Sequence, residues 1–386
     1  MNQKFIPLSV PVLEGNELKY VTEAIKSGWV SSSGHYVGKF ENSLSEYVGT
    51  EGGVACQSGT AGIHLALILS GVTKDDLVIV PTLTFIATVN PVKYVGAAPV
   101  FMDCDDSLCM DPIKLRHFCE NECKLINGRL FEKKTMHHVK AVIVVHVFGN
   151  MADMEEIMDI AKQYHLIVIE DAAEALGTYY LYGRYKGKFA GTIGDFGVFS
   201  FNGNKIITTG GGGMLVAQKS EFLKRAKHLT TQAKVDEINF IHDEIGYNYR
   251  MTNLQAAVGL AQLEQLEEFI AVKVENYNYY VKKVEDIKGL RMMPFREGVR
   301  CNHWFYSLFC DNTYVYSLGQ LQQLFLENLI QVRPVWKLVH TQKPYIGDKH
   351  YKISKAEYYW KHIVNMPSSV NLVKQDIDTI FEQLEH

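Results

Sequence analysis

A lysine beside glycine-rich turns stands out among the residues that could do chemistry. In FSFNGNKIITTGGGGM (199–214), Lys205 lies between an Asn-Gly turn and four consecutive glycines. Glycines carry little bulk and let a ligand approach closely, and a lysine amine can form a Schiff base with a carbonyl cofactor. The alternative is a surface lysine in a mobile loop. The flanking runs VFSF (198–201) and IITT (206–209) predict strand segments instead.

A possible phosphate site precedes this lysine. CQSGTAGIHLALILSG places Ser58, Gly59 and Thr60 at the start of an apolar helix. Free backbone N–H groups, the helix dipole and hydroxyls at such a start can bind a phosphate without any lysine. Ser200, close to Lys205 in the sequence, adds another hydroxyl. For this stretch alone, an ordinary N-cap before a core helix is an equally good interpretation.

A carboxylate at a predicted strand end completes the set. Asp171 directly follows the run LIVIE. A half-buried carboxylate there is costly unless it meets a cation, and a protonated pyridine nitrogen is such a cation. The alternative is an N-cap for AAEALG. A phosphate site, a strand-end aspartate and a downstream lysine, in this order, predict the protein's side of pyridoxal phosphate chemistry.

Other familiar motifs are absent or incomplete. GRYKGKF (183–189) is one residue too short for a P-loop, no dinucleotide fingerprint follows a strand, and no G-x-S-x-G elbow occurs. His117, Cys119 and Cys123, with the histidines at 137–138, suggest zinc, but no Cys-x-x-Cys pair occurs and the stretch is polar. A solvated helix and loop is the preferred interpretation, and no metal site is predicted.

The surrounding elements predict an α/β fold that would bring these residues together. Short apolar runs read as buried strands at 77–81, 99–105, 141–148 and 166–171. A helix between the last two, within 151–165, would face inward with Met154, Ile157 and Ala161. Alternating strands and helices imply a mostly parallel central sheet with helices on both faces. Ligands of such sheets bind at the carboxyl ends of the strands.

Helices are also predicted at the N-terminus and after the glycine run. Residues 15–28 form an amphipathic pattern with Leu18, Val21 and Ile25 on one face. Thr252 and Gln255 make a capping box for a long helix over 253–284. The chain from about residue 280 is richer in Tyr and Trp and reads as mixed strands and helices. We expect a large PLP-binding α/β domain over 1–265 and a smaller C-terminal α+β domain over 266–386.

Composition narrows the function classes. The chain has 386 residues, of which 47% are hydrophobic, and a formal net charge of −4 gives no reason to expect a nucleic-acid partner. No apolar run approaches the roughly 18 residues of a membrane span, and the first residues lack the layout of a signal peptide. Seven cysteines without framework spacing favour a reducing compartment, so a cytoplasmic location is expected.

The motifs together resemble a known family. SGTA, PTLTFIATVN, HVFGN, IEDAAEALG, FSFNGNKIITTGGGGM and GYNYRMTNLQAA occur in the order typical of the nucleotide-sugar aminotransferases of the DegT/DnrJ/EryC1 family, over nearly the whole chain. The resemblance implies the type I (aspartate aminotransferase) fold. It implies that Lys205 holds pyridoxal 5'-phosphate and then moves the proton, with Asp171 on the pyridine nitrogen, Glu174 near the phenolic oxygen and Phe85 stacked on the ring.

The same resemblance implies further contacts and a partner. Gly59, Thr60 and Ser200 would hold the phosphate, helped by Asn248 from a second subunit, so a homodimer with shared active sites is the expected active unit. Asn248 is also expected at the substrate, and the remaining substrate residues implied are Trp29, Val30, Ser31, Arg333 and Trp336. Arg333 could pair with the nucleotide's diphosphate, although a structural ion pair is the alternative.

One departure suggests a subgroup. Gly211 stands where many family members have Glu, and this version, with the insert at 124–140, resembles the branch acting on UDP-linked 4-keto-6-deoxy-N-acetylhexosamines, as in bacillosamine and legionaminic acid biosynthesis for bacterial surface glycans. The expected reaction moves an amino group from L-glutamate to C4 of such a sugar. Alternatives are a GDP- or dTDP-linked sugar, a related dehydratase, which has His in place of Lys205, and a non-catalytic sugar-binding or regulatory relative.

Overall fold

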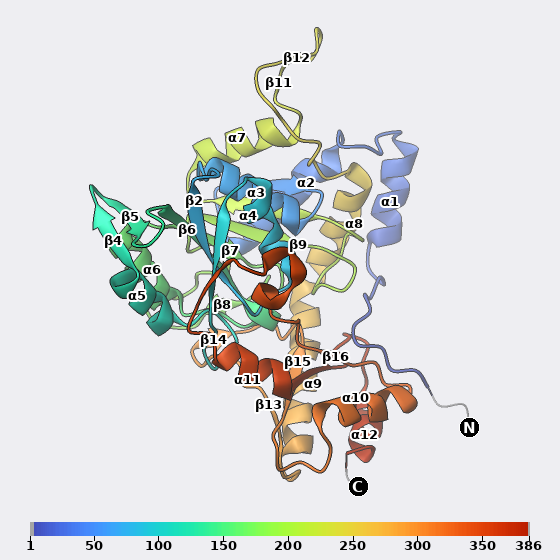
Figure 1. Ribbon diagram of the computed structural model, residues 1–386. Coiled ribbons are helices and arrows are strands. Elements are labelled where there is room, and N and C mark those ends of the chain that lie inside the picture. The colour runs from blue at the N-terminus through green and yellow to red at the C-terminus, as the bar shows by residue number, and fades with distance from the viewer. Residues whose placement is uncertain (1–3, 385–386) are drawn as a thin grey trace.

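A ten-stranded sheet forms the centre of the large part of the molecule (Figure 1). The computed structural model describes residues 4–384. The main path runs β1-β10-β9-β7-β6-β2-β3-β17, with β4 and β5 attached at β6. The strands are β1 Gly53–Cys56, β2 Asp76–Pro81, β3 Ala98–Met102, β4 Cys123–Ile126, β5 Arg129–Glu132, β6 His138–Val145, β7 Ile167–Asp171, β9 Phe196–Ser200, β10 Gly213–Ala217 and β17 Lys349–Tyr351.

The sheet is mostly parallel, which confirms the predicted fold class. The pairs β17/β3, β3/β2, β2/β6, β6/β7 and β7/β9 are parallel, and β9/β10 and β10/β1 are antiparallel. The predicted strand runs at 77–81, 99–105, 141–148 and 166–171 each overlap one of these strands. As a result, β2, β6, β7 and β9 all end at one edge of the sheet.

Helices cover both faces. Successive strand residues alternate between two apolar cores: Ile79 and Val142 point into one, and Val78 and Ile143 into the other. The first core is covered by α2 His35–Val48, α5 Pro112–Asn121, α6 Met154–Tyr164 and α8 Asn253–Glu264. The second is covered by α3 Gly59–Leu69, α4 Asn90–Tyr94 and α7 Ser220–Thr230. The three-layer arrangement follows from this alternation.

Of the two predicted helix faces, that of α6 is confirmed and that of α1 (Glu17–Lys26) is not. In α6, Met154, Ile157 and Ala161 are buried as expected. In α1, the expected apolar face was wrong: Leu18 is 80% and Ile25 57% exposed, while Glu17 and Ala24 are buried. The Glu17 carboxylate accepts hydrogen bonds from the side-chain amides of two glutamines, Gln262 and Gln265. Of the predicted face only Val21 packs against the large core, next to Tyr20 and Ala24, so α1 is held by this polar network and by a different apolar face.

Two predictions after Lys205 were also wrong in detail. IITT (206–209) is not a strand: the chain turns, and the Thr209 N–H returns to the carbonyl of Phe201. The single long helix over 253–284 is two helices, α8 and α9 Leu266–Val284, because the chain leaves helical geometry at Gln265 (φ −105°, ψ −3°). The capping box of Thr252 with Gln255 is confirmed.

A second, antiparallel sheet carries its own core. Its order is β13-β15-β18-β16, with β13 Leu290–Met292, β15 Tyr306–Cys310, β16 Arg333–Pro334 and β18 Ile363–Met366. It packs with α9, α10 Leu318–Glu327 and α12 Lys374–Glu382. Helix α9 joins the two parts, because Ile270 packs in the large core and Tyr280 in the small one. A domain division at residue 265 stays a prediction. Strand β17 lies in the C-terminal part of the sequence but pairs with β3 in the large sheet.

Short elements complete the fold. A two-stranded ribbon pairs β8 Tyr179–Tyr180 with β14 Val299–Arg300, and α11 Lys355–His362 precedes β18. Single 3₁₀ turns lie at η1 Ile86–Thr88, η2 Val147–Gly149, η3 Val339–Thr341 and η4 Lys343–Tyr345. None of the described helices is long and apolar enough to cross a membrane. All seven cysteines are described, and each is a buried free thiol.

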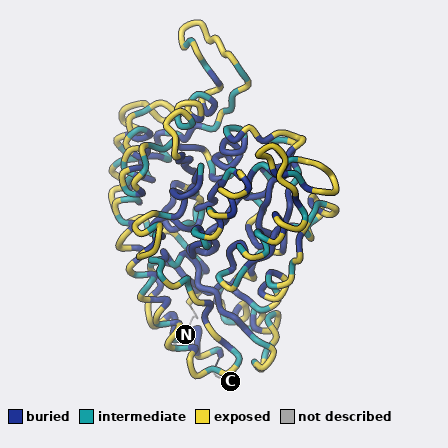
Figure 2. The backbone as a smooth tube through the Cα atoms, turned by 90° about the vertical axis from the view of Figure 1, so that its left-hand side faces the viewer, coloured by how far each residue is buried: buried dark blue, intermediate teal, exposed yellow. Residues whose placement is uncertain are grey.

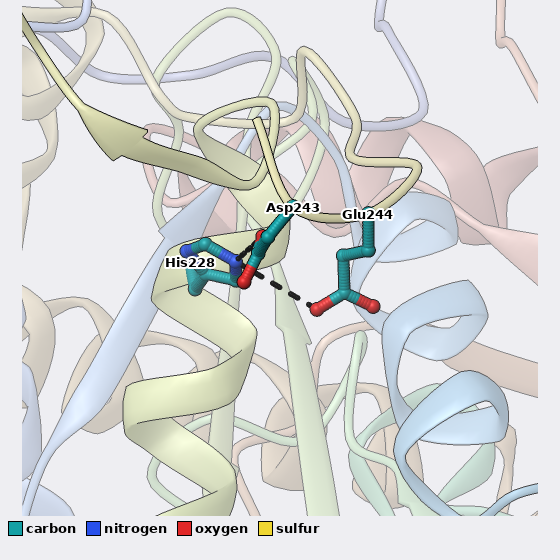
Figure 3. A group of neighbouring side chains, drawn as sticks. All are labelled: His228, Asp243 and Glu244. Carbon is teal, nitrogen blue, oxygen red and sulfur yellow. Dashed lines mark hydrogen bonds and ion pairs between the residues drawn. The ribbon is translucent and has the colours of Figure 1, made fainter. Parts of the chain in front are cut away.

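A hairpin of β11 Lys234–Asp236 and β12 Ile241–His242 projects from the body, and Figure 2 shows its exposed tip. Figure 3 shows its base, where His228 of α7 meets Asp243 (2.7 Å) and Glu244 (3.7 Å). Arg225 donates to both carboxylate oxygens of Glu244. Among the described residues, these three form the group whose side-chain ligand atoms lie close enough together to hold a metal ion. However, the Asp243 carboxylate already pairs with the His228 imidazole, and the Glu244 carboxylate already pairs with Arg225. The group acts as an anchor for the hairpin.

A buried polar pair lies just under the carboxyl edge of the sheet. Glu170 on β7 and His146 after β6 are 0% exposed, and His146 Nε2 lies 2.8 Å from the Glu170 carboxylate. The Ala152 N–H donates to His146 Nδ1, which leaves the proton on Nε2. The Glu170 carboxylate also accepts the backbone N–H groups of Gly191, Ile193 and Gly194. One carboxylate thus fixes two segments next to Asp171.

Replacing Glu170 by Ala should therefore be strongly destabilising. The imidazole and the backbone N–H groups would stay buried without an acceptor, at a cost of about 3–5 kcal/mol in unfolding free energy. Chemical denaturation of the variant and the wild type measures this. The control is Glu156→Ala, whose carboxylate is half exposed and pairs with Arg116 on the surface; it should change stability by less than about 1 kcal/mol. Equal losses in the two variants would contradict the interpretation.

Candidate active site

A cavity of about 740 Å³ opens at the carboxyl edge of the large sheet. It is bounded by the segments that follow β2, β6, β7 and β9, by the start of α3, and by β16 of the small sheet. The predicted site residues that line it are Gly59, Thr60, Phe85, Asp171, Glu174, Ser200, Lys205, Arg333 and Trp336. The folded chain therefore brings together residues from five separate stretches of the sequence.

Asp171 ends β7 and is 4% exposed, so it is more deeply buried than the half-buried position expected. No helix follows it, so it is not a helix N-cap. Its carboxylate accepts hydrogen bonds from the Thr88 hydroxyl (2.7 Å) and the Ala173 N–H (3.1 Å). Burial raises the pKa of Asp171, and these two donors and Lys205 oppose that shift. A cation at the carboxylate would offset the cost of burial.

Lys205 meets a second buried carboxylate. Its amine lies 3.4 Å from Glu174 Oε1, and the lysine side chain is 12% exposed. The other Glu174 oxygen accepts the Phe148 N–H at 2.8 Å. Burial raises the pKa of Glu174 to about 6, although the positive charge of Lys205 opposes the shift. A carboxylate that binds a proton near pH 6 therefore lies next to the Lys205 amine.

The donor to Glu174 sits on a strained backbone. Phe148, in HVFGN, has φ 56° and ψ 21°, a left-handed conformation that is uncommon for a bulky residue and costs on the order of 1–3 kcal/mol. In this conformation the Phe148 N–H donates a hydrogen bond to the Glu174 carboxylate, and the centroid of the Phe148 ring lies 4.7 Å from that of the Trp336 ring. Such strain persists only where surrounding contacts hold it, and here both contacts line or border the cavity.

The predicted phosphate site has the expected local form. Ser58 is the N-cap of α3, and its hydroxyl accepts the Ala61 N–H. The first N–H groups of a helix have no partner within the helix, and those of Gly59 and Thr60 belong to residues that line the cavity. Ser200 lies beside them, since a Cβ on Gly59 would be 3.1 Å from Ser200 Cβ. A cofactor phosphate fits this donor set.

The four glycines at 210–213 differ in how closely neighbouring atoms pack against them. A Cβ on Gly213 would lie 2.5 Å from the Ser58 carbonyl carbon, and one on Gly212 would lie 2.3 Å from Thr209 Oγ1. Gly210 has φ +77° and open space, so it is a turn residue. Gly211 lines the cavity, and the nearest atom to an added Cβ is 3.9 Å away. Space beside Gly211 is therefore available to a ligand.

A further wall of the cavity comes from β16 of the small sheet, from the segment directly after it and from Phe85 after β2. Arg333 and Lys337 both line the cavity, and within the described part of the chain neither forms an ion pair. The Arg333 guanidinium donates a hydrogen bond to the carbonyl of Val332. Phe85 is 54% exposed, with its ring 6.5 Å from that of Trp336. The wall combines two cations with two aromatic rings, and the structural ion pair considered for Arg333 is not formed.

Some predicted residues lie elsewhere. Trp29, Val30, Ser31 and Asn248 are exposed and do not line the cavity of their own chain. The insert at 124–140 forms the β4–β5 hairpin at the sheet edge and start of β6, and it does not line the cavity either. The residues implicated in zinc binding are divided: Cys119 and Cys123 are buried, whereas His117 and His137 are exposed.

Sequence reasoning missed two residues at the centre of the site. Thr88 holds Asp171, as described above. Trp304 places its ring centroid 4.0 Å from the Lys205 amine, close enough for a cation–π contact. The alternation of Thr84, Phe85 and Thr88 after β2 could have suggested Thr88. No local pattern marks Trp304, because it comes from the segment before β15.

A lysine, a buried strand-end aspartate and a helix start that face one cavity on this sheet define a pyridoxal phosphate enzyme of the type I fold. The chain belongs to the DegT/DnrJ/EryC1/StrS aminotransferase family, whose sequence pattern matches residues 11–385. It is thus a PLP-dependent aminotransferase. When bound, the cofactor supplies an electron sink for carbanion chemistry.

Individual relatives agree with this assignment. A GDP-perosamine synthase from Escherichia coli O157:H7 is 38% identical, covering 99% of this chain and 98% of the relative. A putative pyridoxal phosphate-dependent aminotransferase, EpsN, from Bacillus subtilis (strain 168) is 40% identical, covering 99% and 96%. The crystal structure of a DegT DnrJ EryC1 StrS aminotransferase from Brucella abortus is 26% identical with a TM-score of 0.86, covering 96% of this chain and 94% of that one.

The raised pKa of Glu174 leads to a test by pH. Because the pKa is about 6, the carboxylate is charged above pH 6 and protonated below it, so its attraction for Lys205 fades as pH falls. We expect kcat/KM to fall about tenfold between pH 7 and pH 5. Glu174→Gln should flatten this limb, whereas Glu120→Gln, on an exposed surface, should leave it. An unchanged acid limb in Glu174→Gln would assign it to another group.

Proposed function

We propose that this enzyme moves an amino group from L-glutamate to C4 of a nucleotide-linked 4-keto-6-deoxy sugar. The observation that carries the proposal is a single cavity lined by the Lys205 amine and Asp171 and also by two cations, Arg333 and Lys337, that form no ion pair within the described residues. A nucleotide diphosphate needs such cations. One relative is named GDP-perosamine synthase, and this name contains a nucleotide-linked amino sugar. The name therefore supports a nucleotide-linked sugar as the class of substrate.

The chain's own residues would divide the work. Lys205 binds the cofactor's carbonyl and, once released, is placed to move the proton at the amino acid's Cα. Glu174, 3.4 Å from that amine, is the nearest group able to exchange a proton with it. Asp171 would keep the pyridine nitrogen protonated, Phe85 would cover the ring, and the first turn of α3 with Ser200 would hold the phosphate.

For the sugar, we propose a UDP-linked 4-keto-6-deoxy-N-acetylhexosamine. The open space beside Gly211 supports this choice, because a substituent such as an acetamido group needs room where a glutamate side chain would otherwise stand. The second candidate is a GDP-linked 4-keto-6-deoxyhexose, which the name of the 38% identical relative favours. The two differ in both base and substituent at C2, so substrate assays separate them.

We also propose a homodimer with shared active sites, at work in the cytoplasm. Asn248 is exposed and outside its own chain's cavity, as a residue that serves a second subunit would be. Apolar side chains are exposed on α1 and on the projecting hairpin, where Leu18 is 80% and Ile238 87% accessible. Exposed apolar surface of this kind is typical of an interface.

A substrate panel tests the reaction. Purified protein with L-glutamate should form an amino sugar and 2-oxoglutarate from the UDP-linked keto sugar, followed by mass spectrometry, and borohydride should fix the cofactor to Lys205. Lys205→Ala should lose at least about 10³-fold in rate, whereas Lys186→Ala, on the surface, should behave as wild type. Reaction with a GDP- or dTDP-linked sugar alone would overturn the UDP assignment, and full activity of Lys205→Ala would overturn the transaminase.

Mixing two inactive variants tests the shared site. Lys205→Ala and Asn248→Ala should each have little activity as homodimers. In a co-expressed mixture, each heterodimer contains one site with both residues intact, so about a quarter of wild-type activity should return in random assembly. Light scattering should report a dimer throughout. If the mixture shows only the sum of the separate activities, Asn248 does not serve a neighbouring subunit.

A further inference from the structure

Trp304 contacts Lys205 in two ways. Its ring lies 4.0 Å from the amine, and its indole N–H donates to the carbonyl of Asn204, the residue just before the lysine, at 2.7 Å. Trp304 is 3% exposed. The ring therefore covers one side of the amine, while the indole N–H fixes the backbone from which Lys205 extends. The conformation of Lys205 depends on where this one side chain sits.

Trp304 belongs to a short strap, residues 302–305, that the large part of the molecule holds tightly. Asn302 donates to the carbonyls of Glu174 and Leu176 and accepts the Trp304 N–H. Gly149 makes room for the strap, since a Cβ there would lie 1.9 Å from Asn302 Oδ1. The strap also contains a left-handed residue between Asn302 and Trp304. Such a conformation needs fixed neighbours to persist.

The other side of the strap is held by a buried lysine on α9. Lys273 is 2% exposed, and its amine donates to the carbonyl of Trp304 at 3.1 Å and to the carbonyl of Ser368. The Ser368 hydroxyl donates to the same Trp304 carbonyl at 3.1 Å. No carboxylate in residues 4–384 lies within ion-pair distance of Lys273.

Burying the Lys273 amine costs free energy, and hydrogen bonds from its N–H groups to buried carbonyls offset that cost. Burial lowers the pKa of Lys273 to about 7, so near neutrality the amine is divided between charged and neutral forms. Both forms retain at least two N–H donors, and two carbonyls accept them. An apolar side chain of similar length would avoid the desolvation cost but would leave the Trp304 carbonyl with only the Ser368 hydroxyl.

We propose that Lys273 is a positioning residue that holds Trp304 against Lys205 and so fixes the reactive amine in the cavity. This inference rests on Lys205 being the reactive amine of the proposed function. It assigns a role to a residue that does not line the cavity and does not touch a substrate. The line of action runs from the amine of Lys273 through the Trp304 carbonyl to the indole ring and then to Lys205.

A double-mutant cycle tests the line of action without any sugar substrate. In cofactor-free protein, reductive methylation with formaldehyde and a borane reports the accessibility of Lys205, measured by mass spectrometry against Lys186 in the same chain. We expect Lys273→Met to raise the Lys205 labelling rate roughly threefold or more, because Trp304 moves away from the amine. In a chain that already carries Trp304→Leu, the same substitution should alter the rate less than about twofold.

Controls separate positioning from general destabilisation. Lys282→Met changes an exposed lysine on the same helix and should leave Lys205 labelling unchanged. If Lys273→Met does not fold, Ser368→Ala removes the weaker donor to the same carbonyl and should give a smaller rise in the same direction. Equal fold-changes with and without the Trp304→Leu substitution, or folded variants with unchanged labelling, would overturn the proposal.

The outcome is independent of the proposed reaction. Borohydride trapping of pyridoxal phosphate on Lys205, done on the same preparations with cofactor added, tests the reactive amine alone. If trapping fails while the labelling cycle shows coupling, the proposed function is wrong and the role of Lys273 stands as a contact to an unreactive lysine. If trapping succeeds without coupling, the positioning role is wrong.

Discussion

Burying three ionisable groups at one edge of a sheet is the constraint on which the rest of this structure depends. Asp171, Glu174 and Lys205 are each mostly or fully removed from water, although isolated buried charges are strongly disfavoured. The two carboxylates raise each other's cost, and one lysine cannot fully offset both. The fold therefore surrounds the carboxylates with backbone and hydroxyl donors, and a cationic ligand would complete the charge balance at Asp171.

Those donors explain why the fold keeps a strained backbone and buried polar groups that would otherwise destabilise it. The left-handed Phe148 brings an N–H to Glu174, and the Thr88 hydroxyl reaches Asp171. Behind them, the pair of Glu170 and His146 fixes the segment that carries Phe148, and each oxygen of the Glu170 carboxylate has a hydrogen-bond partner. Strain and buried polar groups thus gather where the chemistry is, as expected when local stability is given up for function.

Site residues that a local sequence pattern marks could be predicted, with the help of the general rule that ligands bind at the carboxyl ends of parallel strands. Asp171 and the start of α3 were found because each ends or begins an apolar run, Lys205 was found because glycines flank it, and the parallel-sheet rule places strand ends together. The face of α1 was predicted wrongly, because apolar spacing ignores Gln262 and Gln265, whose side chains pair with Glu17. Trp304 was missed because no short-range signal marks a residue that meets Lys205 only through tertiary folding.

Two parts of the chain build the cavity, and each contributes a different chemistry. The carboxyl edge of the large sheet supplies the Lys205 amine and the carboxylates, while β16 of the small sheet supplies Arg333 and the segment directly after it supplies Trp336 and Lys337. Helix α9 spans both cores, and its Lys273 reaches the strap that lies between them. The strap is also fixed to the large part, because Asn302 donates to the carbonyls of Glu174 and Leu176. Trp304 therefore keeps its place over the Lys205 amine through contacts from both parts of the chain.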